Sequence, residues 1–195
     1  PFPLMGTGEG AIAELNDGRL YYTSRTHWFA DSSAFTSKRS HAWSYDGGET
    51  WIDLGFSDTL PDGPRYRGDE GRGSGHKSHW GMLAGLAVLS AEGKDILLYS
   101  NSDISSHERK RMTVWASFDR GHTWPIKRLA NEGYSAYSSL IVGRPETVSE
   151  GWIYLQFEGG EDKEYEKSYL ARFNINWILH GTLTGDGELP DWAKL

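Results

Sequence analysis

The residues of this sequence that could carry chemistry are a tyrosine, a glutamate and two arginines. Tyr137 begins an apolar stretch, Glu9 lies between two glycines just before another, and Arg25 ends the stretch that follows. Arg109 precedes the apolar run that starts at Met112. A carboxylate can take the proton of a nearby phenol, and a guanidinium can pair with a carboxylate through two parallel hydrogen bonds. Taken singly, each has an ordinary alternative as a half-buried aromatic, a solvated loop carboxylate or a surface cation.

A repeated octapeptide indicates the elements that position these residues. Residues 44–51 read Ser-Tyr-Asp-Gly-Gly-Glu-Thr-Trp and residues 117–124 read Ser-Phe-Asp-Arg-Gly-His-Thr-Trp, so both follow S-x-D-x-G-x-T-W. Asp can bond backbone amides within a turn, Gly supplies a positive φ, and Trp buries a large apolar surface beside the turn. The repeat therefore predicts two antiparallel hairpins, and by itself no chemistry.

The rest of the chain also favours an all-β fold. Its apolar stretches are short and alternate at period two, which predicts about nine to eleven strands and no amphipathic helix of about ten residues or more. Asp17-Gly18 between two such stretches is a hairpin signal, and residues 174–180 fit either a short helix or a strand continuation. Residues 26–40, rich in Ser, and 58–79, rich in Gly and charge, are expected to form surface loops.

Composition excludes several classes of protein. The hydrophobic content of 37% and aromatic content of 13% in 195 residues are enough for one domain with a core. A net charge of −7 argues against a nucleic-acid partner, and no run of about 18 apolar residues predicts a membrane span. Cysteine is absent and the histidines are scattered, so neither a thiolate site nor a metal or other cofactor is predicted.

In combination, these features resemble the exo-sialidase (neuraminidase) superfamily, whose members are six-bladed β-propellers with Asp-box repeats. The resemblance runs in the family's order through residues 9–25, the two octapeptides, and residues 96–101, 109–114, 136–140 and 157–160. It implies that residues 1–195 form a single, incomplete domain that supplies roughly the last three blades. Because propellers close with about four to eight blades, the resemblance assigns the chain to the C-terminal half.

The same resemblance implies roles for two of the residues. Tyr137 matches the family's tyrosine nucleophile, and Glu9 matches the glutamate that takes the phenol proton. The substrate, sialic acid, carries a carboxylate beside its anomeric carbon, so a neutral tyrosine avoids the repulsion that an Asp or Glu nucleophile would meet. A phenol with a pKa near 10 is a poor nucleophile without such a base.

The resemblance also implies how the substrate is held. Arg25 and Arg109 match the second and third arginines of the triad that binds the substrate carboxylate. Arg109 is preferred over Arg111 because its spacing from the following apolar run matches the family pattern. Glu158 resembles the glutamate that holds one triad arginine in place.

Two elements of the family have no counterpart in the sequence. The first triad arginine and the acid/base aspartate would precede Glu9, and Asp31 is only a spatial candidate for the acid. The expected partner is therefore an N-terminal half of the propeller, from the same precursor or a second chain. The chain alone is expected to be inactive and poorly soluble. The residues do not predict its compartment, although a secreted or periplasmic location is compatible with the family.

The leading prediction is a retaining exo-sialidase that hydrolyses terminal sialic acid, or a related nonulosonic acid, from glycans. Two alternatives stay open at this point. One is a propeller that binds acidic sugars without cleaving them, and the other is an Asp-box propeller of another glycosidase or receptor type. The linkage preference is not predicted.

Overall fold

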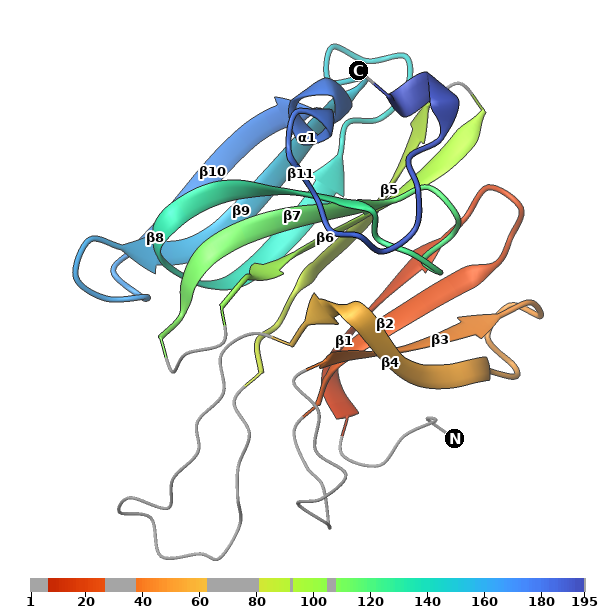
Figure 1. Ribbon diagram of the computed structural model, residues 1–195, viewed down its shortest axis with the longest axis horizontal. Helices are drawn as coiled ribbons and strands as arrows, with labels where there is room; N and C mark the ends of the chain where they lie inside the picture. Colours follow the sequence, from red (N-terminus) through yellow and green to blue (C-terminus); the bar gives the residue numbers. More distant parts are fainter. Residues whose placement is uncertain (1–6, 27–37, 63–80, 92, 105–107, 195) are drawn as a thin grey trace, which may run out of the picture.

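The computed structural model describes residues 7–26, 38–62, 81–91, 93–104 and 108–194. They form two antiparallel sheets, seen as the red-to-orange and green-to-blue parts of Figure 1. The first sheet has the order β1-β2-β3-β4, with β1 Thr7–Glu14, β2 Leu20–Thr26, β3 Lys38–Ser44 and β4 Ile52–Pro61. The second has the order β10-β9-β8-β7-β6-β5, with β11 beside β8. Its strands are β5 Gly85–Ala91, β6 Lys94–Ser102, β7 Lys110–Ser117, β8 Ile126–Val142, β9 Trp152–Gly160, β10 Lys167–Asn174 and β11 Thr182–Leu183.

Strand β8 is 17 residues long and belongs to two units of the second sheet. Its first half pairs with β7, from Ile126 opposite Ala116 to Tyr134 opposite Lys110. Its second half pairs with β9, and the register shifts between Ser135 and Ser138. The sequence analysis placed Tyr137 at the start of a strand, whereas it lies within this long, bulged one. The two sheets thus contain three successive units, as consecutive propeller blades would.

Two hydrophobic cores lie between the three units. One packs the first sheet against β6 and β7 and contains many aromatic side chains: Tyr21, Trp43, Tyr99, Trp115 and Trp124. The other packs the opposite face of β6 and β7 against β9, β10 and the helix that follows. Strand β6 is therefore buried on both faces, with Ile96 and Leu98 in one core and Leu97 and Tyr99 in the other. This explains its continuous apolar run, because a strand covered on both sides does not alternate with polar residues.

The two Asp-box repeats form the same turn. Asp46 Oδ1 accepts from the Thr50 amide at 2.9 Å, and Asp119 Oδ1 accepts from the Thr123 amide at 2.9 Å. The repeat's serine hydroxyl likewise accepts from a glycine amide at 2.9 Å in both copies. Those glycines have φ values of 93° and 92°, which other residues adopt only with strain. The predicted hairpin turns are confirmed.

Helical structure is sparse among the described residues. Helix α1, Ile175–Leu179, decides the ambiguity over residues 174–180, and the Asn174 side chain caps it by accepting from the Trp177 amide at 3.0 Å. None of the helices is long and apolar enough to cross a membrane. The two stretches expected to be irregular are shorter than predicted, because residues 38–40 belong to β3 and 58–61 to β4. Their other parts, including Asp31, lie largely outside the described residues.

Candidate active site

The predicted site residues gather at one end of the strands, and the Asp-box turns lie at the other. Glu9 lies near the start of β1, and Arg25 lies near the end of its antiparallel neighbour β2. Arg109 immediately precedes β7, and Tyr137 is carried by the second half of β8. The antiparallel order of the strands therefore brings together side chains that are far apart in the sequence.

A β-bulge orients the Glu9 side chain. The pairing of β1 with β2 shifts between Gly8 and Gly10, and Glu9 has a φ of 45°, in the left-handed region. Bulges redirect side chains, and a non-glycine residue in this region costs energy that the surrounding structure must supply. Arg39 contributes to that support, because its Nη2 donates to the Glu9 carbonyl at 3.2 Å.

Tyr137, Glu9 and Arg25 contact one another. The Tyr137 hydroxyl donates to Glu9 Oε1 at 3.4 Å, and Arg25 Nη1 donates to Glu9 Oε2 at 2.5 Å. The same Arg25 nitrogen lies 3.4 Å from the Tyr137 oxygen. Arg25 is 6% exposed, whereas the Glu9 side chain is 30% exposed. The phenol oxygen thus has a base on one side and a cation beside it, in a position that solvent can reach.

Arg109 lies over the ring of the tyrosine. Its guanidinium carbon is 5.1 Å from the centre of the Tyr137 ring, and the residue is 6% exposed. Arg111, by contrast, points to the surface, where it forms an ion pair with Glu132. Of the two arginines considered from the sequence, the structure places Arg109 beside Tyr137.

A buried ion pair that the sequence analysis missed lies beneath the site. Arg39 has no exposed surface and donates to Asp62 Oδ1 and to the Met82 carbonyl, each at 2.8 Å. A Cβ atom on Gly81 would lie 2.5 Å from Asp62 Oδ2 and 2.7 Å from Arg25 Cγ. This glycine therefore allows the chain before β5 to pass close to Arg25 and Asp62. Neither Arg39 nor Asp62 stood in a recognisable sequence motif.

Glu158 lies on β9, but no hydrogen bond or ion pair joins it to Arg25 or Arg109. One carboxylate oxygen, Oε2, is buried and has no hydrogen-bond partner among the described residues. Such an atom normally has a partner, because a buried carboxylate without one is costly. Its role as an arginine anchor stays a prediction.

Tyr165 is a further residue that the sequence analysis did not identify. It lies in the loop between β9 and β10, and its hydroxyl oxygen accepts a hydrogen bond from Arg109 Nη1. Its ring centre is 5.7 Å from the Arg109 guanidinium, so this cation lies against two tyrosine rings. The possible signal was a lone aromatic in the charged segment Glu161-Asp162-Lys163-Glu164-Tyr165-Glu166.

The arrangement provides a phenol, a carboxylate able to accept its proton, and two buried guanidinium groups. Such groups can bind a carboxylate-bearing ligand beside the phenol oxygen. The 3.4 Å separation of Tyr137 and Glu9 is longer than a usual O–H···O bond, as in many catalytic pairs without substrate. No group of three or more potential metal ligands occurs within the described ranges.

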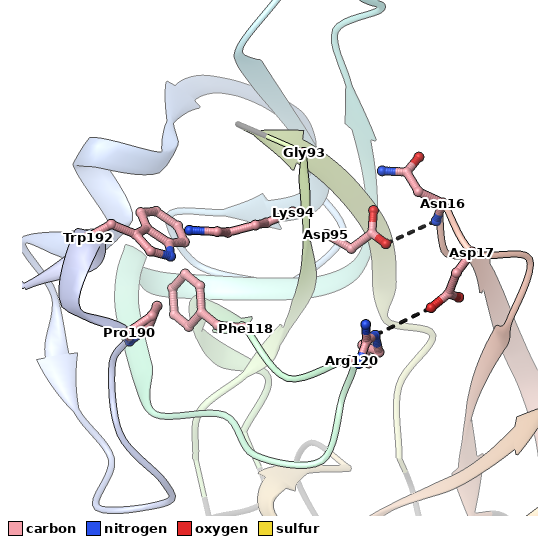
Figure 2. A pocket seen from close by; sticks show the side chains of 9 residues that line it. All are labelled: Asn16, Asp17, Gly93, Lys94, Asp95, Phe118, Arg120, Pro190 and Trp192. Carbon is pink, nitrogen blue, oxygen red and sulfur yellow. Dashed lines mark hydrogen bonds and ion pairs between the residues drawn. The ribbon is translucent and has the colours of Figure 1, made fainter.

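A cavity of about 540 Å³ lies at the opposite end of the strands, near the second Asp-box turn (Figure 2). Its charged side chains already have partners in the cavity wall. The carboxylate of Asp95 accepts from the Asn16 amide at 3.0 Å, Arg120 lies 3.5 Å from Asp17, and Lys94 lies over the Trp192 ring. We therefore assign the candidate site to the other end.

Comparison with known proteins gives consistent results. No protein-family model matches the chain. A sialidase of Micromonospora viridifaciens is 30% identical over 189 residues, which are 97% of this chain and 25% of that protein. The intramolecular trans-sialidase of Ruminococcus gnavus has a similar structure, with a TM-score of 0.60 and 20% identity over 87% of this chain and 33% of that one. The NanB sialidase of Streptococcus pneumoniae gives a TM-score of 0.62 and 20% identity, over 91% of this chain and 25% of that one.

The chain thus spans about a quarter of the length of the curated relative that it matches. Its predominantly β structure, its three blade-like units and its two Asp-box turns agree with the fold of these proteins. Sequence and structure together show that the chain belongs to the sialidase superfamily, as part of a sialidase-type β-propeller.

Proposed function

We propose that the protein containing this chain is an exo-sialidase that releases a terminal sialic acid, or a related nonulosonic acid, with retention of configuration. The observation that carries the proposal is the contact of the Tyr137 hydroxyl with the Glu9 carboxylate, beside two buried arginines. Sialidases among its relatives support the same reaction class. The activity belongs to the whole protein, of which this chain would supply part of the site.

In the first step, the Tyr137 oxygen forms a bond to the anomeric carbon while Glu9 accepts the phenol proton. The glycosidic bond breaks, and its oxygen leaves with a proton from a general acid. In the second step, the general acid, now deprotonated, takes a proton from water as the water oxygen bonds to the anomeric carbon. The tyrosyl bond breaks, and the phenol recovers its proton from Glu9. Two displacements at one carbon leave its configuration unchanged, which is the retaining outcome.

Arg25 and Arg109 are proposed to bind the substrate carboxylate. Both are almost fully buried, so little water competes with a bound anion and their side chains are already ordered. Bidentate pairing would fix the sugar's orientation as well as supply charge. The positive charge of Arg25 beside the hydroxyl and of Arg109 over the ring would also stabilise negative charge that develops on the tyrosine oxygen during attack.

The remaining machinery is proposed to come from an N-terminal half of the propeller. This part would supply the aspartic acid that protonates the leaving group and the first arginine of the carboxylate site. The buried, unpartnered Oε2 of Glu158 is a suitable acceptor for such an arginine. The glycan partner would carry the acidic sugar at its terminus.

The test is the Tyr137→Phe variant of the full-length protein, assayed by release of a fluorescent phenol from an aryl sialoside. Turnover should fall by about 100-fold or more, while binding of N-acetylneuraminic acid is kept. In the wild-type protein, a fluorinated sialosyl fluoride should label Tyr137 covalently, so that the peptide containing Tyr137 gains the mass of the sugar. Tyr134→Phe is a matched control, because its phenol bonds Glu108 and packs against Lys110 instead. Unchanged turnover in Tyr137→Phe would refute the role of Tyr137.

A second candidate function is recognition of acidic sugars without cleavage. The observation that favours it is the long Tyr137–Glu9 distance of 3.4 Å, because proton transfer requires closer approach. If the full-length protein binds N-acetylneuraminic acid but neither releases the phenol nor is labelled at Tyr137, the binding function replaces the catalytic one.

A further inference from the structure

The Tyr165 hydroxyl is hydrogen-bonded to the guanidinium of Arg109, the group that the proposed function assigns to the substrate carboxylate. Its oxygen accepts the hydrogen bond of Arg109 Nη1, and its ring also faces this cation. The other terminal nitrogen of Arg109, Nη2, donates to the Gly81 carbonyl at 3.4 Å. Both ends of the guanidinium fork therefore have partners in the protein, one a backbone group and one a side chain.

Hydrogen bonds and an ion pair hold the backbone of the loop that carries Tyr165, whereas the Tyr165 side chain is largely exposed. Glu166 Oε2 accepts from the amides of Glu161 and Asp162, at 2.9 and 3.2 Å, and Lys167 forms an ion pair with Glu161. Tyr165 itself is 57% exposed, and its hydrogen bond in the described structure is the one from Arg109. Rotating its side chain therefore breaks one hydrogen bond and one ring contact, without unfolding the loop.

The charges of the two groups decide which acceptor Arg109 prefers. Partial burial raises the pKa of Tyr165, with Arg109 acting in the opposite direction, so the phenol is neutral near neutral pH. The bond from Arg109 to Tyr165 has one charged group, the guanidinium, whereas a bond from Arg109 to a carboxylate joins two opposite charges. A carboxylate can also take two parallel N–H groups of an arginine. An anionic ligand can therefore displace the tyrosine, whereas a neutral ligand offers no comparable replacement.

We propose that Tyr165 is a placeholder for the substrate carboxylate. Its hydroxyl binds Arg109 when no ligand is present, and its side chain rotates away when the carboxylate of an acidic sugar binds Arg109. This inference rests on the proposed function, because it assumes that Arg109 binds the carboxylate. The conformation in which Tyr165 binds Arg109 competes with the ligand. The apparent Kd is therefore the intrinsic Kd divided by the fraction of molecules in which Arg109 is free of Tyr165. Tyr165 also keeps a buried cation paired until the proper anion replaces it.

The test compares wild type and Tyr165→Phe of the full-length protein by calorimetric titration with N-acetylneuraminic acid. Removing the competing oxygen should tighten binding by about three- to tenfold. Tyr165→Ala, which removes the ring as well, should bind at least as tightly as wild type, and Tyr134→Phe should match wild type. The uncharged methyl ester of the same sugar should show less than about a twofold change, because it does not compete for Arg109.

The possible outcomes separate the two proposals. If wild type does not bind N-acetylneuraminic acid, both the proposed function and this inference fail. If wild type binds it and Tyr165→Phe binds equally or more weakly, only the placeholder role is refuted, and weaker binding would make Tyr165 a direct ligand contact. An equal gain for the acid and the methyl ester also refutes it, since Tyr165 would then restrict access rather than compete for the arginine.

Discussion

Replacing Arg39 by methionine tests whether the buried ion pair beneath the site stabilises the protein. The variant removes the guanidinium that bonds Asp62 and the carbonyls of Met82 and Glu9. The Asp62 side chain is 7% exposed, so water cannot readily replace the lost guanidinium. Breaking a buried pair in this way costs about 3–5 kcal/mol, and full burial of Arg39 means that solvent screening does not reduce the figure.

The expected loss lowers the Tm, measured by calorimetry on the full-length protein. A cooperative unit of about 150–250 residues would lose about 6–20 °C, and a larger one would lose less. The double variant Arg39→Met/Asp62→Leu should recover part of the loss, because it replaces both members of the buried ion pair by apolar side chains. A loss below about 1 kcal/mol for Arg39→Met would refute the reasoning. So would a double variant less stable than the single one. Turnover at a temperature where the variant is folded should also fall, since Glu9 loses the support of its strained backbone.

Two further predictions concern the arginines and an Asp-box turn. Arg109→Ala should raise the KM for a sialoside by about 30-fold or more. Arg111→Ala loses only the exposed ion pair with Glu132 and should change the KM less than about twofold. Equal effects of the two variants on the KM would contradict the assignment of Arg109. Hydrogen bonds from the Thr50 hydroxyl and amide lower the pKa of Asp46 from 3.8 to about 2. This turn should therefore stabilise the fold above about pH 4 and lose that contribution as the pH falls towards 2. The difference in Tm between wild type and Asp46→Asn should narrow over this window, and a constant difference would exclude the linkage.

The sequence predicted the fold class and the turns well, because their signals are local. Both Asp-box repeats combine a positive-φ glycine with a short Ser/Asp/Thr hydrogen-bond network, and each of these features is set within eight residues. The continuity of β8 was not predicted. Asn131-Glu132-Gly133 reads as a break between strands, yet the chain continues through it because β7 and β9 pair with successive halves of one strand.

The candidate site was predictable only through the family resemblance. Glu9 and Tyr137 are 128 positions apart, and no local pattern reports their contact. Three further residues could not be identified from the sequence, because their importance comes from their contacts. Arg39 binds the Glu9 carbonyl at the bulge, Gly81 lies against the Arg25 side chain, and Tyr165 binds the Arg109 guanidinium. Long-range packing decides such contacts, and residue type alone does not encode them.

The two proposed chemical partners, Tyr137 and Glu9, stand on different sheets, and this division has a mechanical consequence. Backbone pairing of β7 with β8, which ends in a bond from the Ser135 amide to the Arg109 carbonyl at 2.8 Å, sets the separation of Arg109 from Tyr137. No such pairing joins β8 to β1, so side-chain volumes in the aromatic core set the spacing of the phenol and its base. A larger or smaller side chain at Trp115 or Tyr21 would therefore change the distance between Tyr137 and Glu9 more than the distance between Tyr137 and Arg109. The efficiency of the proposed proton transfer would thus depend on core side chains that lie outside the proposed ligand site.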